Sequence, residues 1–207
     1  MIIYTYKKER NEDMSIVIEN ILTRRSIRKY TNQQISDENL NIILEAAKHA
    51  PSGGNSQTWH FTVIQNKEKL LMLNNYIKDA FEKLEVDEKT YKSIKSGKIA
   101  SKSDSYNFYY NAPTLILVSN NEDYGNAMAD SACALENMFL TSHDLNLGSC
   151  WINQISWFDN DKNVRSLLTD MGISEKHKVC GSICIGHMDG DAPIAKNRKE
   201  GTVTIIK

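Results

Sequence analysis

The sequence predicts a single domain of the α+β class, and three observations lead to that prediction. Its 207 residues are enough to bury one substantial core but few for two domains. Segments with helical periodicity alternate along the chain with a few short apolar runs that are typical of strands. No internal repeat and no low-complexity linker divides the chain.

The helices are predicted from apolar residues that recur every three or four positions. One helix should start after Ser36, a good N-cap, with Asp37 and Glu38 in the first turn where the helix dipole favours negative charge. It should stop before Pro51, and another helix should close at Gly172. Five helices are expected, over residues 15–22, from 37 to the residues before 51, and over 67–84, 124–145 and 160–171.

Strands are predicted where short apolar runs are bounded by polar residues. The run over residues 113–119 is almost continuously apolar, which is typical of a buried strand. Further strands are expected over residues 61–65, 148–152 and 178–186, and the tail at 202–206 is also strand-like. Residues 85–106 are polar and rich in Lys and Ser, so a short helix and a mobile loop are expected there.

The longest expected helix, residues 124–145, is apolar on two faces. Met128 and Met138 belong to one face, and Cys133 and Leu140 belong to another. Such a helix is buried between layers or lies at a subunit interface.

The charges are nearly balanced, and this limits the possible partners. Twenty-five basic and 26 acidic residues give a formal charge of −1, which argues against a nucleic-acid-binding surface and a polybasic membrane anchor. No apolar run approaches the ~20 residues of a membrane span, and the first residues lack the apolar core of a signal peptide. We expect a cytoplasmic protein with an N-terminal extension, residues 1–13, and one domain, residues 14–207.

The four cysteines are expected to be reduced and buried, as in a cytosolic protein. Cys180 and Cys184 are four positions apart, which fits neither a CxxC redox pair nor half of a zinc site. Their even spacing should place both on one face of the strand at 178–186. The five histidines are scattered without metal-binding spacing, so no metal site is expected.

A cluster of arginines directly follows the first expected helix. Arg24, Arg25 and Arg28 lie within five residues, with Ser26 between them. Arginine supplies forked donors and serine a hydroxyl, so the cluster suits a phosphate or another anion. The alternative is a solvated basic helix end, which the helix dipole also favours.

A second motif lies at residues 50–61. Pro-Ser-Gly-Gly at 51–54 forms a loop in which two glycines let backbone amides approach a ligand closely. The side-chain amides of Asn55 and Gln57 can bond a heterocycle through donors and acceptors. A plain turn before a strand would look similar, and Trp59 is expected to pack in the core or an interface.

Cations gather again near the end of the chain. Lys196 and Arg198 follow the strand that ends at Gly186, in the sequence Ala-Lys-Asn-Arg-Lys. An exposed basic loop is the alternative interpretation.

Taken together, these motifs resemble the nitroreductase family. The chain has Arg-Arg-Ser-x-Arg after the first helix and Pro-Ser-x-x-Asn-Ser-Gln-x-Trp-x-Phe about two dozen residues later. Leu-Gly-Ser-Cys-Trp-Ile and Gly-x(9)-Lys-x-Arg follow in the same order as in that family. The second motif is the most specific, and the resemblance covers about residues 14–207.

The resemblance implies a fold, a partner and a cofactor. The fold would be a mostly antiparallel sheet flanked by helices, with the C-terminal segment exchanged in a homodimer. FMN would lie in the dimer interface, and NAD(P)H would be its transient electron donor. No Rossmann motif for NAD(P)H is found, as expected if the nicotinamide only stacks briefly on the flavin.

The same resemblance assigns roles to particular residues. The FMN phosphate would be held by Arg24, Lys196 and Arg198. Arg25 and Ser26 would lie beside the ribityl chain or ring edge, and Arg28 near N1 and O2, where negative charge collects on reduction. The other subunit would contribute Pro51, Ser52, Gly53 and Asn55. The ring would be lined by Cys150, Trp151, Ile152 and Asn153, with a backbone N–H aimed at N5.

The implied function is an FMN-dependent oxidoreductase that passes hydride from NAD(P)H to nitroaromatic, quinone or similar small electrophilic acceptors by a ping-pong mechanism. The flavin does the hydride chemistry, so no catalytic side chain is needed beyond Arg28 as a charge stabiliser. The alternatives are a dehalogenase-like or flavin-destroying enzyme of the same fold, and an FMN-binding protein with little turnover. Unlike some family members, the chain has no Lys or Arg at 105–110, which leaves Arg28 as the expected cation near N1.

Overall fold

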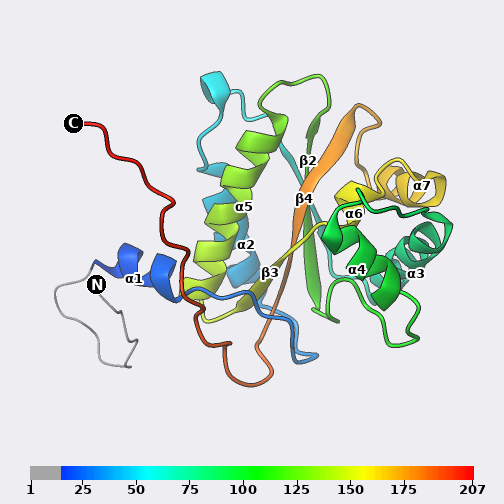
Figure 1. Ribbon diagram of the computed structural model, residues 1–207, viewed down its shortest axis with the longest axis horizontal. Coiled ribbons are helices and arrows are strands. Elements are labelled where there is room, and N and C mark those ends of the chain that lie inside the picture. The colour runs from blue at the N-terminus through cyan, green and yellow to red at the C-terminus, as the bar shows by residue number, and fades with distance from the viewer. Residues whose placement is uncertain (1–14) are drawn as a thin grey trace.

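An antiparallel sheet of four strands organises residues 15–207, the part of the chain that the computed structural model describes (Figure 1). The expected N-terminal extension, residues 1–13, lies outside the described residues. The strands are β1 (His60–Ile64), β2 (Thr114–Asn121), β3 (Gly148–Ile152) and β4 (His177–Gly186). The helices are α1 (Ile16–Thr23), α2 (Asp37–Lys48), α3 (Lys67–Lys83), α4 (Lys92–Ala100), α5 (Ala127–Asp144), α6 (Gln154–Trp157) and α7 (Lys162–Asp170). This arrangement confirms the predicted α+β class.

The strand order is β1-β2-β4-β3, and each neighbouring pair is antiparallel. The two central strands are almost entirely buried, as the apolar run at 113–119 predicted. The strand expected over residues 202–206 is not part of this sheet. An extended segment becomes a strand only when another strand pairs with it, and no strand of this sheet pairs with residues 202–206. Val203 and Ile206 are 75% and 93% exposed.

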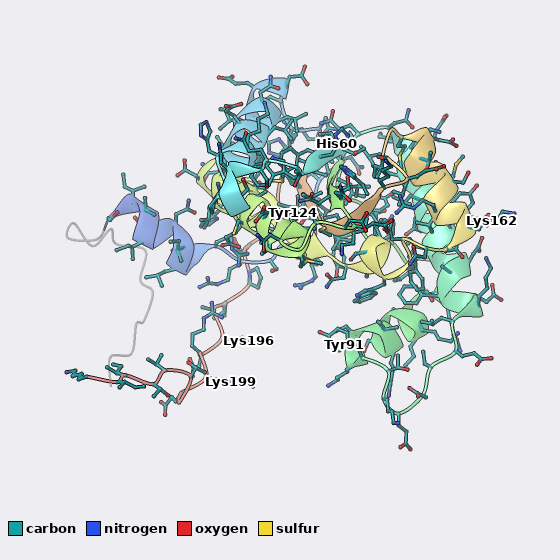
Figure 2. The ribbon with its side chains drawn as sticks, turned by 90° about the horizontal axis from the view of Figure 1, so that it is seen from above. His60, Tyr91, Tyr124, Lys162, Lys196 and Lys199 are labelled. Atoms are coloured by element: carbon teal, nitrogen blue, oxygen red, sulfur yellow. The ribbon has the colours of Figure 1, made fainter. Side chains whose placement is uncertain are left out.

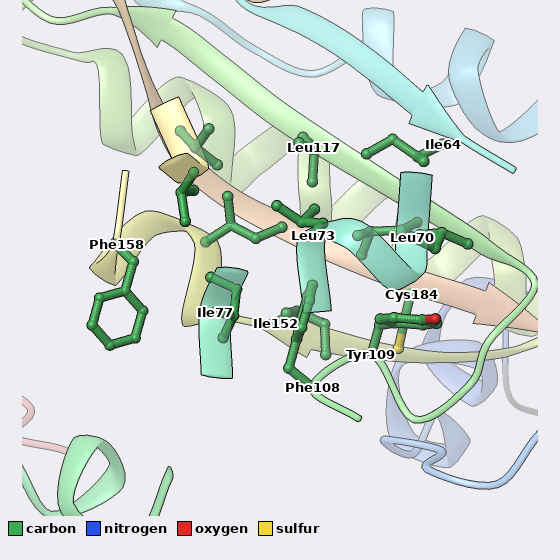
Figure 3. Packing of buried hydrophobic residues seen from close by; sticks show 14 of the residues in the cluster. Ile64, Leu70, Leu73, Ile77, Phe108, Tyr109, Leu117, Ile152, Phe158 and Cys184 are labelled. Atoms are coloured by element: carbon green, nitrogen blue, oxygen red, sulfur yellow. The ribbon is translucent and has the colours of Figure 1, made fainter. Parts of the chain in front are cut away.

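Helices cover both faces of the sheet and create two apolar cores. Successive side chains of β2 point to opposite faces, so Leu115 and Leu117 enter one core while Ile116 and Val118 enter the other. The first core packs against α3 and α7, where Leu73 is fully buried (Figure 3). The second core packs against α2 and α5.

The helix ends follow the chemistry predicted for them. Ser36 accepts a hydrogen bond from the Asn39 N–H at 3.1 Å and so caps α2. Gly172 has a φ of +90° after α7, and the Ile173 N–H returns to the Leu168 carbonyl at 3.1 Å, which is a Schellman motif. The expected short helix within residues 85–106 is α4.

Helix α5 is covered along only part of its surface. Met138 is buried against the sheet, while Met128, which was expected on the same buried face, is 52% exposed. The second face meets α1 near its end, where Asn20 donates to the Leu140 carbonyl at 3.0 Å. Helix α1 in turn leaves Ile16 73% exposed and Val17 63% exposed.

The cysteines are free, but the prediction that Cys180 and Cys184 share one face is wrong. The pairing of β2 with β4 shifts between Val118 and Ser119, so Cys180 is an extra residue in a β-bulge. The bulge reverses the alternation of side chains. Cys180 lies beside Ser131 of α5, whereas Cys184 belongs to the core on the other face.

Candidate functional site

Residues 24–28 run in an extended line beside the outer edge of β3. Ser26 forms a bridge with Ser149, and the Ile27 N–H donates to the Ser149 carbonyl at 2.9 Å. Gly148 permits this close approach, because a Cβ there would lie 2.8 Å from Ile27 Cγ2. Since side chains alternate along an extended chain, Ile27 turns into the core and every second residue faces outward. This alternation would place Arg24, Ser26 and Arg28 on the outer side, and of these Arg24 and Ser26 are half-buried and Arg28 is exposed.

All three side chains are near enough to Cys150 to influence its thiol. Burial raises the pKa of Cys150, and the charge of Arg28, the Ser26 hydroxyl and the charge of Arg24 act in the opposite direction. The net pKa is still raised, so the group is a neutral thiol at pH 7. The fold of one chain therefore brings Arg24, Ser26 and Arg28 near Cys150, and their common role in a cofactor site stays a prediction.

Arg24 packs against an aromatic ring of α5, which in turn stacks on a ring of β3. Its guanidinium carbon lies 5.5 Å from the centroid of the Phe139 ring. Phe139 stacks on Trp151 at 6.1 Å, and the Trp151 indole N–H donates to the Asn153 side-chain oxygen at 2.5 Å. These contacts connect the first arginine to Trp151 and Asn153, two of the residues expected beside the flavin ring. Ile152, between them, is buried.

Arg28 has a different neighbour. Its Nε donates to the Tyr110 hydroxyl at 3.3 Å, and its guanidinium carbon lies 5.7 Å from the Tyr110 ring centroid. Burial raises the pKa of Tyr110, although Arg28 opposes this, so the phenol is neutral at pH 7. Residues 105–110, which contain no Lys or Arg, thus place the phenol of Tyr110 beside Arg28.

Arg25 points away from this group. Its Nη1 donates to the carbonyls of Leu22 at 2.8 Å and Arg24 at 2.7 Å, and so satisfies backbone groups at the end of α1. For this residue the structure shows the helix-end role, and a role beside the ribityl chain stays a prediction.

The loop at residues 51–57 is fixed by a buried carboxylate. Asp130 of α5, 6% exposed, accepts the Gly53 N–H through both oxygens at 3.2 and 3.3 Å. The Tyr124 hydroxyl donates to Asp130 at 2.9 Å and also reaches the Gly53 carbonyl. Gly54 and Asn55 have φ values of 60° and 56°, so the turn exposes Asn55. Pro51 is exposed and Ser52 half-buried in the same loop.

Within one chain, this loop and the arginines lie at opposite ends of α5. The loop is held by Asp130, whereas Arg24 contacts Phe139, and Thr23, the preceding residue, contacts His143 at 2.8 Å. Asp130 and His143 are thirteen positions apart, which is roughly 20 Å along a helix. Figure 1 shows the short turn of the loop and the end of α1 at opposite ends of this helix.

Lys196 and Arg198 are not brought to the other cations. Beyond the Asp189 N–H, which donates to the Lys29 carbonyl at 3.1 Å, the chain continues as an arm, residues 190–207, whose side chains are all exposed. Figure 2 shows Lys196 on this arm away from the body of the domain. Within residues 15–207, neither Lys196 nor Arg198 has a side-chain hydrogen bond or ion pair.

Four residues of the site were not singled out from the sequence: Asp130, Tyr124, Phe139 and Tyr110. The first three lie in or next to a helix whose apolar pattern hides any functional role, and Tyr110 was noted only as part of a segment without cations.

Trp59 is half-buried and stacks on Phe61 at 6.1 Å, which agrees with the packing role expected for it. No group of His, Cys, Asp or Glu suitable for a metal ion occurs in residues 15–207. None of the helices described is long and apolar enough to cross a membrane.

Comparison with known proteins identifies the family of this chain. The nitroreductase family model matches residues 21–187. A protein from Archaeoglobus fulgidus named "Putative NADH dehydrogenase/NAD(P)H nitroreductase" is 30% identical over 174 residues, which is 84% of this chain and 86% of that protein. The iodotyrosine deiodinase of Hydra vulgaris is 30% identical over 180 residues, covering 74% of this chain and 63% of that enzyme.

One solved structure extends the likeness to the whole described fold. A nitroreductase from Bacteroides fragilis, solved with bound FMN, is 43% identical to this chain, with a TM-score of 0.85. The match covers 94% of this chain and all of the other. The family model over residues 21–187 and this structural match show that the chain belongs to the nitroreductase family.

Proposed function

We propose that this protein is an FMN-dependent NAD(P)H oxidoreductase that reduces small electrophilic acceptors such as nitroaromatics and quinones. The observation that carries the proposal is the row of Arg24, Ser26 and Arg28 along the outer edge of β3. The names of the Archaeoglobus and Bacteroides relatives, an NAD(P)H nitroreductase and an FMN-bound nitroreductase, support it.

The residues present suit FMN. Arg24 offers a charge-assisted fork to a phosphate, and its stacking on Phe139 limits the conformations that it must give up on binding. β3 is an edge strand, so backbone groups on its outer side are available to the polar edge of a ring beyond the bridge at Ser149. Arg28 is exposed and ready to face an anion.

The protein side of the mechanism is binding and electrostatics. FMN, when bound, supplies the hydride-transfer chemistry. Arg24 would hold the phosphate of the cofactor, Ser26 would lie beside its ribityl chain or ring edge, and Arg28 would stabilise the negative charge that appears on reduction. Cys150 and Tyr110 stay neutral at pH 7, because burial raises the pKa of each, and so they leave the charge of Arg28 available.

The active form that we propose is a homodimer with exchanged C-terminal arms. Exposed apolar residues on three segments support it: Ile16 and Val17 on α1, Met128 on α5, and Ile206 on the arm. A second subunit also resolves the separation of the site residues. Its loop 51–55 would meet residues 24–28 of the first subunit, and its arm would bring Lys196 and Arg198. The four free cysteines support a cytoplasmic location.

Mixed dimers test the shared site directly. Arg24→Ala and Asn55→Ala are placed either on different chains or together on one chain of a dimer. If the loop serves the partner's site, placing them on different chains leaves one intact site and one doubly altered site. Placing them on one chain damages both sites. FMN occupancy near one half in the first case and well below it in the second is expected. The reverse pattern would show that each chain builds its own site.

Steady-state kinetics test the activity. One binding face must serve the donor and the acceptor in turn, so double-reciprocal plots for NAD(P)H and a quinone should be parallel. Intersecting lines would argue against a ping-pong scheme. A yellow protein that releases FMN on denaturation is expected, and release of FAD would contradict the cofactor assignment.

A second candidate function is reductive dehalogenation, which the similarity to the Hydra deiodinase favours. The anaerobically reduced protein would be offered a nitroaromatic, a quinone and an iodinated phenol. Rapid reoxidation by the iodinated phenol, with slow reoxidation by the other two, would favour this alternative.

A further inference from the structure

The segment before β2 contains two successive residues in the left-handed region. Tyr110 and Asn111 both have a φ of +56°, a conformation that costs free energy for residues other than glycine. Such a backbone persists only where its surroundings impose it. The left-handed pair turns the chain just before Pro113, and Tyr110 extends toward Arg28.

Two asparagines impose this turn. The Asn107 side-chain oxygen accepts the N–H groups of Tyr109 at 3.1 Å and Asn111 at 2.9 Å. Asn74, buried on α3, accepts the Phe108 N–H at 3.0 Å and donates to the Tyr106 carbonyl at 3.1 Å. The backbone on the N-terminal side of Tyr110 is thus fixed to both the turn and a core helix.

The buried neighbours fix the segment further. Phe108 is 1% exposed and Tyr109 is 7% exposed, and both belong to the core shared with α3 (Figure 3). Tyr110 is the next residue and is only half-buried. Its hydroxyl accepts the Arg28 Nε–H, while its ring lies near the guanidinium plane. A rigid phenol therefore limits the positions open to an otherwise exposed arginine.

The chemistry of this contact suits an arginine that serves another anion. A carboxylate partner would neutralise Arg28, whereas a neutral phenol orients it and leaves its positive charge unpaired. Within residues 15–207, Arg28 forms no ion pair with a carboxylate. The Nε donor is occupied by Tyr110, and the two terminal nitrogens of the fork stay free for a ligand.

We propose that Tyr110 is a positioning residue that directs the Arg28 guanidinium toward the site where negative charge develops on the reduced flavin. This inference rests on the proposed function, because it requires FMN beside Arg28. It adds a residue that acts on the flavin only through Arg28 and whose orientation is set by the turn at 107–111.

A double-mutant cycle on the FMN-loaded protein tests the proposal. The measured quantity is the ratio of the dissociation constants of oxidised and reduced FMN, obtained from titration together with the flavin midpoint potential. Tyr110→Phe keeps the ring and removes the hydroxyl. It should lower the preference for reduced FMN by roughly two- to tenfold, the effect of one hydrogen bond, and lower the midpoint potential correspondingly. Arg28→Ala should lower both by more.

The decisive variant is the combination of the two. If Tyr110 acts through Arg28, then Tyr110→Phe has no further effect on the preference or the potential in the Arg28→Ala protein. Equal effects in both backgrounds, or no effect in either, would overturn the positioning role. Tyr91→Phe, which alters a 63% exposed tyrosine at the start of α4, is the matched control and should leave the potential unchanged.

The failure of this inference is distinguishable from the failure of the proposed function. A wild-type protein that binds no FMN would overturn both. A wild-type protein that binds FMN and oxidises NAD(P)H, combined with an additive cycle, would overturn only the role of Tyr110. Thermal unfolding of each variant shows whether a change in potential accompanies a loss of folding.

Discussion

Two regions carry the cations expected at one phosphate, and they are built in opposite ways. Arg24 directly follows α1, two residues before the bridge between Ser26 and Ser149 of β3, and stacks on a buried phenylalanine. Arg198 lies on an exposed arm without a side-chain bond to residues 15–207. The fold of one chain thus determines the position of the first cation, while the second needs a surface that one chain does not provide. FMN affinity should therefore depend on dimer formation mainly through the arm, and much less through residues 24–28.

Removing the end of the arm should have the largest effect. Deletion of residues 200–207 takes away Val203, Ile205 and Ile206, each worth roughly 1.5–3 kcal/mol when fully buried against another surface. We expect the dimer to weaken by several kcal/mol and FMN to dissociate with it, while the domain itself stays folded. Sedimentation velocity and flavin fluorescence measure the two losses.

Thr204→Ser, a conservative change at an exposed position of the same arm, is the control for the deletion. A truncated chain that sediments as a monomer and keeps full FMN occupancy would show that the arm has no part in the site.

Single arginine changes should show the contrast more sharply. Arg24→Ala and Arg198→Ala should each weaken FMN binding by one to two decades, the value of charge-assisted hydrogen bonds worth roughly 1.5–3 kcal/mol. Only Arg24→Ala should also lower the stability of the apo-protein, by about 0.5–1 kcal/mol, because it loses the stacking on Phe139. Isothermal titration and denaturant unfolding separate these effects. Equal destabilisation by both changes would erase the distinction between the regions.

The hydrogen bonds of Asp130 and Tyr124 to Gly53 fix the loop 51–57 within one chain, and this loop offers a further test. Tyr124→Phe removes the hydroxyl that bonds Asp130 and the Gly53 carbonyl and accepts from Ser56. We expect a loss of about 1 kcal/mol in unfolding free energy. FMN affinity should fall by less than for the arginine variants, and the dimer should be unchanged. Tyr76→Phe, at a half-buried tyrosine of α3 outside the loop, serves as the comparison. A Tyr124→Phe protein with weakened dimers would show that these hydrogen bonds support the dimer contact instead.

The smallest effect should appear in the pH dependence of the apo-protein. Burial lowers the pKa of His143, and the charges of Arg24 and Arg25 lower it further. The unfolded chain then binds the proton more readily than the folded chain, so unfolding free energy falls as pH drops below the unfolded value of about 6.5. His143→Gln should reduce this slope, and His49→Gln, at a side chain that is 77% exposed, should not. Chemical denaturation between about pH 7.5 and pH 5 measures the slopes. An unchanged slope in His143→Gln would show that this histidine does not sense the arginines.

Much of the fold was predictable because local rules decided it. Ser36 caps α2 and Gly172 closes α7 through backbone bonds that depend on a few adjacent residues. The apolar run of β2 can be satisfied only between two layers. The exposure of Met128 was not predictable in the same way. The apolar pattern of α5 does not show which part of the helix is covered by the rest of the same chain.

The site shows the same division. The spacing of Arg24, Ser26 and Arg28 already implies one common side, because side chains alternate along an extended chain. The roles of Tyr110 and Asp130 depend on contacts 82 and 77 positions away in sequence. The bulge at Cys180 likewise depends on the register between β2 and β4, to which a single strand sequence gives no clue.

The raised pKa values of the buried sheet cysteines affect how readily they are oxidised during aerobic turnover. Reduced flavins pass electrons to oxygen, and the resulting peroxide attacks thiolates much faster than thiols. Burial raises the pKa of Cys184 to about 12 and also raises the pKa of Cys150, its neighbour across the strands. Both therefore stay in the slowly reacting form when reduced flavin generates oxidant. Oxidative damage during aerobic turnover should reach the half-buried Cys133 on α5 before it reaches Cys150 and Cys184.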